Sequence, residues 1–195
     1  MGVHAKIFKV QIQIIERMFK KLKFITRSAL KILYALASDP MCAFYQREVA
    51  KEAEVSVGSA NRTLKVLAEK ELVTKEKRGK IFLYKFNTES TVARQIKILF
   101  NVNELDELVR TLKKYSKRIV LFGSCAEGND VKDSDIDLFV LTSEKGTVKK
   151  IINSYETLRK IAPIIVDAND FVKMRNEDKP LYDSVLRGIR LWETE

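Results

Sequence analysis

The chain has 195 residues and a formal net charge of +10, with 46% apolar and 32% charged residues. This composition suits one large or two small domains with hydrophobic cores. It excludes a membrane-spanning protein, because no apolar run approaches the roughly 18–20 residues that a spanning helix needs.

The cysteine and histidine content excludes further classes. The two cysteines, Cys42 and Cys125, are isolated, and His4 is the only histidine, so a Cys/His zinc site is excluded. Lysines and glutamines interrupt the apolar residues at the N-terminus, unlike a secretory signal peptide. We therefore expect a cytoplasmic protein with reduced thiols and no membrane partner.

The positive charge is concentrated in the first half of the chain. Residues 1–100 contain 20 Lys and Arg against 9 Asp and Glu, whereas residues 101–195 contain 16 against 17. This asymmetry indicates two modules, the first of which faces a polyanion such as nucleic acid. A lysine-rich solvated surface explains the same charge without a partner, so composition alone leaves both interpretations open.

The first 23 residues form an arm whose pattern fits two structures. Apolar residues from Phe8 to Ile14 alternate as in a strand, whereas Val10, Ile14 and Met18 recur at helical spacing. We favour a helix used in homodimerisation, because a short apolar arm needs a partner surface.

Residues 24–88 predict three helices followed by a hairpin. The first helix, Thr26–Ser38, ends at Asp39-Pro40, and "YQREVAKEAEV" predicts a second. Ser56 is a suitable N-cap for the third. Two strand-like runs then flank Gly79, which can adopt the positive φ of a tight turn.

This order resembles the winged helix-turn-helix domains of small microbial transcription regulators. The resemblance implies that Ser56–Lys70 is a recognition helix and Lys75–Lys80 a basic wing that bind double-stranded DNA. Ser, Asn and Arg side chains reach base edges, and Lys reaches phosphates. Glu71 departs from the pattern, which often has glycine there. A domain used only for protein contact is the alternative. The candidate DNA-binding residues are Ser56, Ser59, Asn61, Arg62, Lys65, Lys77, Arg78 and Lys80.

The second half predicts an α/β layer domain. Residues 89–103 read as a linker helix, and residues 104–195 contain helix, strand, strand, helix and strand patterns in that order. The helical pattern breaks near Asn101–Asn103, and the helix after residue 147 turns Tyr155 and Leu158 inward. The whole chain is therefore expected to be α+β, with a small mixed sheet in its second domain.

Two alternating aspartates begin one of these strands. Asp135 and Asp137 precede the apolar run from Leu138, and residues two apart in a strand project from the same face. Two carboxylates this close repel each other unless a cation lies between them. Mg²⁺ meets this need, since it takes one or two carboxylates and completes its octahedron with water and phosphate oxygens.

The string "LFGSCAEGNDVKDSDIDLFV", residues 121–140, resembles the signature of the DNA polymerase β nucleotidyltransferase superfamily, in its minimal archaeal and bacterial form. The resemblance implies that Asp135 and Asp137 are catalytic and hold metal. It also implies that Gly123, Ser124 and Ser134 bind the nucleotide. The family transfers a nucleoside monophosphate from NTP to an acceptor, using metal ions that bridge the phosphates.

Active members of the family place a third aspartate on a later strand. The matching run, Ile161–Val166, contains no acid, and Asp167 follows it. Asp167 is either a displaced catalytic ligand or the N-cap of the next helix, and we favour the cap. Glu127 and Asp133 are other candidate acids. Cys125, which follows the Gly123-Ser124 pair, is either a redox group or a small residue packed in the core, and we favour packing.

Two functions follow from these patterns. The first is an NTP- and Mg²⁺-binding nucleotidyltransferase-like protein with a DNA-binding winged helix. It transfers a nucleoside monophosphate to a protein partner such as a paired toxin, or it senses nucleotide. The second is a non-enzymatic DNA-binding transcription regulator with a degenerate nucleotidyltransferase domain. Because no third acid is evident on the later strand, the sequence does not decide between the enzyme and the non-enzymatic regulator.

Overall fold

The computed structural model describes the backbone of residues 2–194 and the side chains of residues 11–20 and 22–194. The chain divides into two compact units, the first formed by residues 1–37 and 41–87 and the second by residues 38–40 and 88–195. Each unit contains its own small sheet, so the fold is mixed α+β, as predicted. No described helix is long and apolar enough to cross a membrane.

The N-terminal arm of the first unit is helical, which confirms the helix that we favoured. It consists of α1 (Gly2–Lys21) and a 3-10 turn, η1 (Leu22–Phe24). All side chains from residue 11 to residue 20 are exposed, including Ile14 at 60% and Phe19 at 64%. The arm thus presents large apolar side chains that the described part of the chain does not cover.

Three helices build the core of the first unit, namely α2 (Arg27–Ser38), α3 (Gln46–Glu52) and α4 (Val57–Glu69). Their apolar faces meet at fully buried residues such as Ile32, Leu64 and Leu67. Ser56 caps α4 as predicted, because its hydroxyl accepts a hydrogen bond from the Ser59 amide at 3.2 Å.

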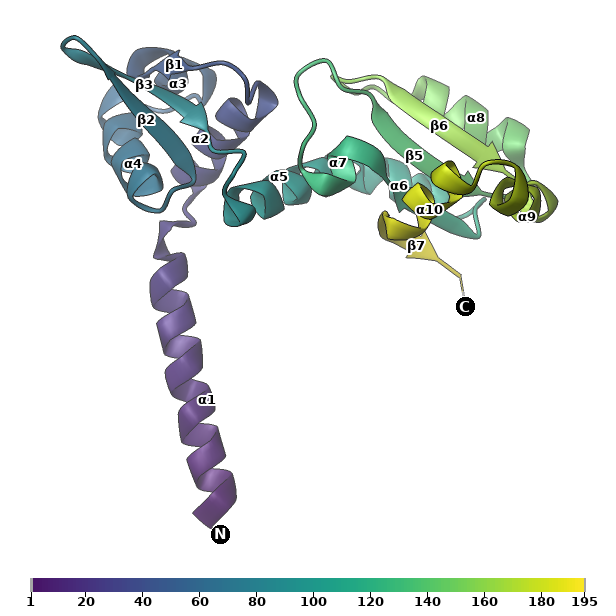
Figure 1. The fold of residues 1–195 in the computed structure, drawn as a ribbon, viewed down its shortest axis with the longest axis horizontal. Helices are drawn as coiled ribbons and strands as arrows, with labels where there is room; N and C mark the ends of the chain where they lie inside the picture. The colour runs from purple at the N-terminus through teal and green to yellow at the C-terminus, as the bar shows by residue number, and fades with distance from the viewer. Residues whose placement is uncertain (1, 195) are drawn as a thin grey trace. The chain divides into compact units, whose positions relative to one another are not determined.

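A three-stranded antiparallel sheet completes this unit, with β1 (Phe44–Tyr45), β2 (Val73–Arg78) and β3 (Ile81–Phe86) in the order β1-β3-β2. The long hairpin of β2 and β3 is visible in Figure 1. The sequence predicted this hairpin but not β1, because two residues are too few to show a strand pattern.

The second unit holds the longer sheet. Its strands are β4 (Arg118–Leu121), β5 (Ile136–Leu141), β6 (Ile161–Val166) and β7 (Ile189–Glu193), in the order β6-β5-β4-β7. β5 and β6 are parallel, whereas β4 is antiparallel to both β5 and β7. Pro163 lies in β6, an edge strand, where a missing backbone donor is tolerated.

Helices cover both faces of this sheet. They are α5 (Thr91–Glu104), α6 (Asp106–Leu112), α7 (Gly123–Glu127), α8 (Lys145–Ser154), α9 (Ala168–Glu177) and α10 (Lys179–Arg187). Ile136, Leu138 and Val140 pack with residues of α6 and α8. Phe139 packs on the opposite face, with residues of α9 and α10. Because side chains alternate along a strand, Asp137 shares the face of Phe139.

Two predictions about this unit are wrong. The helical segment breaks at Leu105, between α5 and α6, and not at residues 101–103. Leu158 was expected to face inward, but α8 ends at Ser154 and Leu158 is 90% exposed. The apolar pattern continues past the helix into a polar loop, and periodicity alone did not show where the helix stops.

Glu71 stands where winged-helix domains often have glycine, and its backbone conformation shows why glycine is common there. It follows α4 with φ +56°, in the left-handed region that non-glycine residues seldom adopt. The Asn87 side-chain amide donates a hydrogen bond to the Glu71 carbonyl at 2.7 Å and helps to hold the turn. The backbone at residue 71 therefore has a conformation that suits glycine and that is strained for glutamate.

We predict that Glu71→Gly stabilises the first unit by up to about 1 kcal/mol, because it removes left-handed strain while adding some unfolded-state entropy. Hydrogen exchange of the β3 amides measures the change. Lys65→Gly, on the exposed side of α4, is the control and should destabilise the unit by about 1 kcal/mol. If the β3 amides exchange more slowly in the wild type than in Glu71→Gly, the wild type is the more stable protein, and the left-handed conformation of Glu71 does not destabilise it.

Candidate functional site

The aspartate pair lies where β4 and β5 meet the short helix α7. Asp135 directly precedes β5 and Asp137 is its second residue, and both side chains are partly exposed. The backbone amide of Phe122, at the end of β4, donates a hydrogen bond to the Asp137 carbonyl at 3.1 Å. This bond ties the Gly-Ser turn to the strand that carries the acids.

The backbone of Gly123 lies close to the Asp137 carboxylate. Its φ is +66°, and a Cβ placed on it would lie 2.2 Å from Asp137 Oδ2. A side chain here would collide with the carboxylate, so the turn requires glycine for both conformation and space. Gly123 of the Gly-Ser motif and Asp137 of the Asp pair are fourteen residues apart in the sequence, yet they lie against each other in the fold.

The electrostatics of the pair favour a bound cation. Partial burial, and then the neighbouring Asp135 carboxylate, raise the pKa of Asp137 above its ordinary value. Lys160 Nζ lies 3.4 Å from Asp135 Oδ2, but both side chains are largely exposed and this ion pair is weak. Among the described residues, no cluster of three or more His, Cys, Asp or Glu could hold a metal ion.

The parallel pairing of β5 and β6 identifies the neighbours of the two acids. Asp137 pairs with Ala162, and the Ile136 amide donates to the Lys160 carbonyl at 2.8 Å. Lys160 and Ala162 therefore stand beside Asp135 and Asp137 on the same face. Neither residue is an acid.

Asp167 lies away from this site. It follows the far end of β6, five residues beyond Ala162, or roughly 16 Å at 3.3 Å per residue. Its carboxylate caps α9 by accepting from the Asp170 amide at 2.9 Å, and it pairs with Lys145 at 2.7 Å. Lys145 and the capping bond lower the pKa of Asp167 to about 2. The structure thus shows Asp167 as the N-cap of α9, the alternative that we favoured.

The remaining candidate residues differ in exposure and in their hydrogen bonds. Ser134 closes a turn, since its hydroxyl accepts from the Val131 amide at 2.9 Å. Ser124 is partly exposed in α7, beside Gly123. Glu127 and Asp133 are exposed, and Glu127 accepts from the Asn129 side chain at 3.3 Å. Neither acid joins the aspartate pair in a three-acid cluster.

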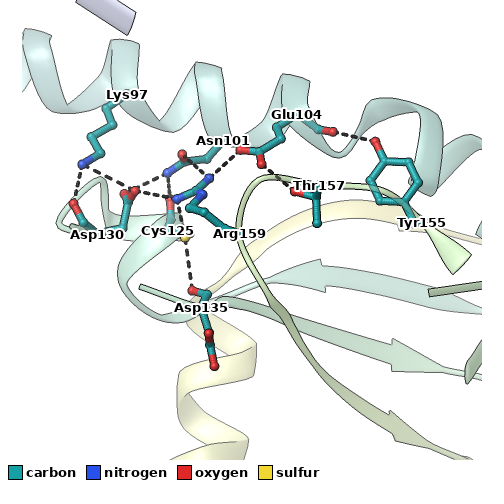
Figure 2. Close-up of polar contacts among 9 residues, drawn as sticks. All are labelled: Lys97, Asn101, Glu104, Cys125, Asp130, Asp135, Tyr155, Thr157 and Arg159. Atoms are coloured by element: carbon teal, nitrogen blue, oxygen red, sulfur yellow. Dashed lines mark hydrogen bonds and ion pairs between the residues drawn. The ribbon is translucent and has the colours of Figure 1, made fainter. Parts of the chain in front are cut away.

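A buried polar cluster underlies the site (Figure 2), and sequence reasoning missed it. Arg159 binds Asp130 at 2.8 Å and Glu104 at 2.6 Å, and Lys97 binds Asp130 at 3.4 Å. Asn101 joins the same group. A signal was present, because Ala93, Lys97, Asn101 and Leu105 recur every four residues and are all buried. Two polar residues on that buried stripe must have polar partners.

Comparison with known proteins assigns the second half of the chain. Residues 103–195 match the family model described as polymerase beta, nucleotidyltransferase. Protein adenylyltransferase MntA of Shewanella oneidensis is 31% identical over 96 residues, which span 49% of this chain and 67% of that protein. The chain belongs to the polymerase beta nucleotidyltransferase family.

Solved structures with detectable likeness include two archaeal proteins. A possible transcriptional regulator from Methanosarcina mazei Go1 is 19% identical, with 51% of this chain and 87% of that one covered and a TM-score of 0.35. A Sulfolobus solfataricus protein assigned as a nucleotidyltransferase is 20% identical, with 52% and 86% covered and a TM-score of 0.32. At these scores the likenesses carry no argument about the function of this chain.

The family match begins at residue 103, so part of the buried cluster precedes it. Lys97 and Asn101 come from α5, on the N-terminal side of the matched segment. This nucleotidyltransferase domain therefore includes contacts from a helix outside the family pattern. A motif search centred on the Gly-Ser and Asp pair does not reach them.

The candidate DNA-binding residues of the first unit differ in exposure. Arg62 and Lys65 are exposed on α4, and Lys77, Arg78 and Lys80 are exposed on the hairpin. Asn61 is half-buried, and the exposed Ser56 is occupied as the N-cap of α4. Ser59 was named as a DNA-binding candidate, but it is half-buried and its hydroxyl lies 3.5 Å from the Ser28 hydroxyl in α2, so its side chain is turned toward α2.

Proposed function

We propose that the second unit binds a nucleoside triphosphate with Mg²⁺ at the Gly-Ser turn and the Asp135–Asp137 pair. The observation that carries this proposal is the contact of Gly123 with the Asp137 carboxylate, which joins the two halves of the family motif. Gly123 and Ser124 are then placed to bind phosphate oxygens. The two aspartates hold the cation that shields them from each other.

The residues present fit one magnesium ion better than two. Two carboxylates and the phosphates of a nucleotide complete one octahedral ion. A second ion, which would stabilise charge on an attacking acceptor, needs a further fixed anion. The β6 positions beside the pair are Lys160 and Ala162, and neither supplies one. We therefore propose that nucleotide binding is intact and that nucleotidyl transfer by this chain is weak.

A protein is the acceptor that best fits the comparisons. The relative from Shewanella oneidensis is named a protein adenylyltransferase, and it is 31% identical to this chain over 96 residues. By this analogy, ATP is the nucleotide to test first, and a protein encoded as a partner, such as a paired toxin, is the acceptor.

The first unit supports a second activity, binding of double-stranded DNA. It has the order of helices and the hairpin that the winged-helix resemblance implies, and its hairpin is exposed and basic. Arg62 and Lys65 lie exposed on the helix that would enter the major groove. The exposed apolar arm, α1, fits homodimerisation, which suits a two-fold DNA site. A DNA-binding regulator without transferase activity remains the second candidate function.

We predict that Asp135→Asn with Asp137→Asn weakens Mg·ATP binding about tenfold or more, or roughly 1.4 kcal/mol, because the variant loses both anionic ligands. Isothermal titration calorimetry measures the affinity. Asp133→Asn is the matched control, since it removes an exposed acid from the same loop and should leave the affinity unchanged. Equal affinity in wild type and the double variant would remove the aspartate pair from the site.

We predict that Ala162→Asp increases the number of Mn²⁺ ions bound with ATP from about one to about two per chain, because it adds a carboxylate beside Asp137. Electron paramagnetic resonance counts the bound manganese. Ala162→Asn is the control, with the same shape and no charge. Two ions in the wild-type protein would contradict the single-metal account.

We predict that the full chain binds duplex DNA with a steep salt dependence, and that Lys80→Gln lowers the slope of log affinity against log salt by about 0.9. Fluorescence anisotropy at several salt concentrations measures the slope. Lys114→Gln removes an equally exposed charge from the second unit and serves as the control. A slope near zero for wild type would exclude the basic hairpin as a DNA contact.

A further inference from the structure

Asn101 lies in the buried cluster below the candidate site, and every polar atom of its side chain has a partner (Figure 2). Its Nδ2 donates to the Cys125 carbonyl and to Asp130 Oδ1, both at 2.9 Å, and its Oδ1 accepts from Arg159 at 3.1 Å. Two acceptors and one donor surround the amide, which fixes its orientation. Aspartate has the same shape but presents only acceptors, so it would place oxygen against oxygen twice.

The charges around Asn101 balance one another. Lys97 and Asp130 have side chains that are only 3% and 4% exposed, and Arg159 joins Asp130 to Glu104. Two cations thus face two carboxylates. Removal of one buried charge leaves its partner uncompensated, so the group holds its members in one arrangement. Asn101 is the neutral member, and it can be altered without removing any of these charges.

This cluster holds both sides of the loop between the Gly-Ser turn and the aspartate pair. Cys125 follows Ser124, and Asp130 lies midway to Asp135. The Cys125 thiol donates to the Asp135 carbonyl at 3.6 Å, which continues the chain of contacts to the pair itself. Gly128 ends α7 so close to α5 that a Cβ on it would lie 2.8 Å from the Arg94 carbonyl. Helix α5 is therefore the support against which the site loop is fixed.

We infer that Asn101 is a positioning residue for the nucleotide site, and that α5 sets the geometry of the Gly-Ser turn through it. This inference rests on the proposed Mg·ATP binding. Asn101 does not touch the ligand. Its amide fixes Cys125 and Asp130, and these residues fix the turn and the strand entry that would hold phosphate and cation. A functional site needs such support because sub-ångström displacement of its ligating groups weakens binding.

The test compares Asn101→Asp with Asn103→Asp in the full chain with Cys42→Ser. Asn103 is exposed on the same helix, so the control makes the same chemical change where it meets water. Calorimetry measures Mg·ATP affinity, and the rate of Cys125 modification by a thiol reagent reports the seating of α7. Cys125 is fully buried, and burial raises the pKa of its thiol to about 11, so it reacts slowly when α7 is seated.

We expect Asn101→Asp to weaken Mg·ATP binding about 10- to 100-fold, as losses of supporting contacts around metal sites do, and to speed Cys125 modification. Asn103→Asp should change neither. If Asn101→Asp does not fold, Arg159→Lys retains the charge but loses the forked contact, and the same two changes are expected. Faster modification with unchanged affinity overturns the inference and leaves the proposed function standing. Absence of Mg·ATP binding in wild type overturns both.

Discussion

The second unit depends on one close approach, that of the Gly123 backbone to the Asp137 carboxylate. A Cβ at residue 123 would lie 2.2 Å from Asp137 Oδ2, so any other residue there would displace the carboxylate. The contact places a turn with exposed backbone beside a partly buried carboxylate whose pKa is raised by that burial and by Asp135. The burial and the neighbouring charge that disfavour the ionised Asp137 carboxylate also favour a cation and its phosphates beside it.

The contact is maintained by structure on both sides of the sheet. Phe139, two residues beyond Asp137, packs against Phe171 with ring centroids 5.3 Å apart, and this packing anchors the strand on the face of the acids. On the opposite side, the buried cluster of Lys97, Asp130 and Arg159 holds the loop that enters the strand. Apolar packing thus fixes the strand and a balanced charge cluster fixes the loop, which leaves the aspartates themselves free of strong internal partners.

The sequence predicted the elements that depend on local patterns. The Gly-Ser turn, the Asp pair on one strand face and the Ser56 cap were all readable, because spacing determines which side chains share a face. The end of α8 and the two-residue β1 were not, because tertiary packing and not periodicity sets them. The support from Lys97 and Asn101 was also missed, since it joins residues about 30 apart in sequence whose pairing only the fold reveals. Whether Asp167 joins the aspartate pair or caps a helix depends on the direction of β6. Because β6 is parallel to β5, Asp167 lies at the end of β6 that is far from the pair.

We propose that the Gly-Ser turn and the Asp pair form a single nucleotide site with one cation. A crystal structure of the chain with Mn²⁺ and a non-hydrolysable ATP analogue tests this most directly, because anomalous scattering locates manganese independently of the protein density. We expect one manganese ion between Asp135 and Asp137, with the triphosphate against Gly123 and Ser124. Nucleotide bound elsewhere, or manganese held by other acids such as Glu127, would contradict it.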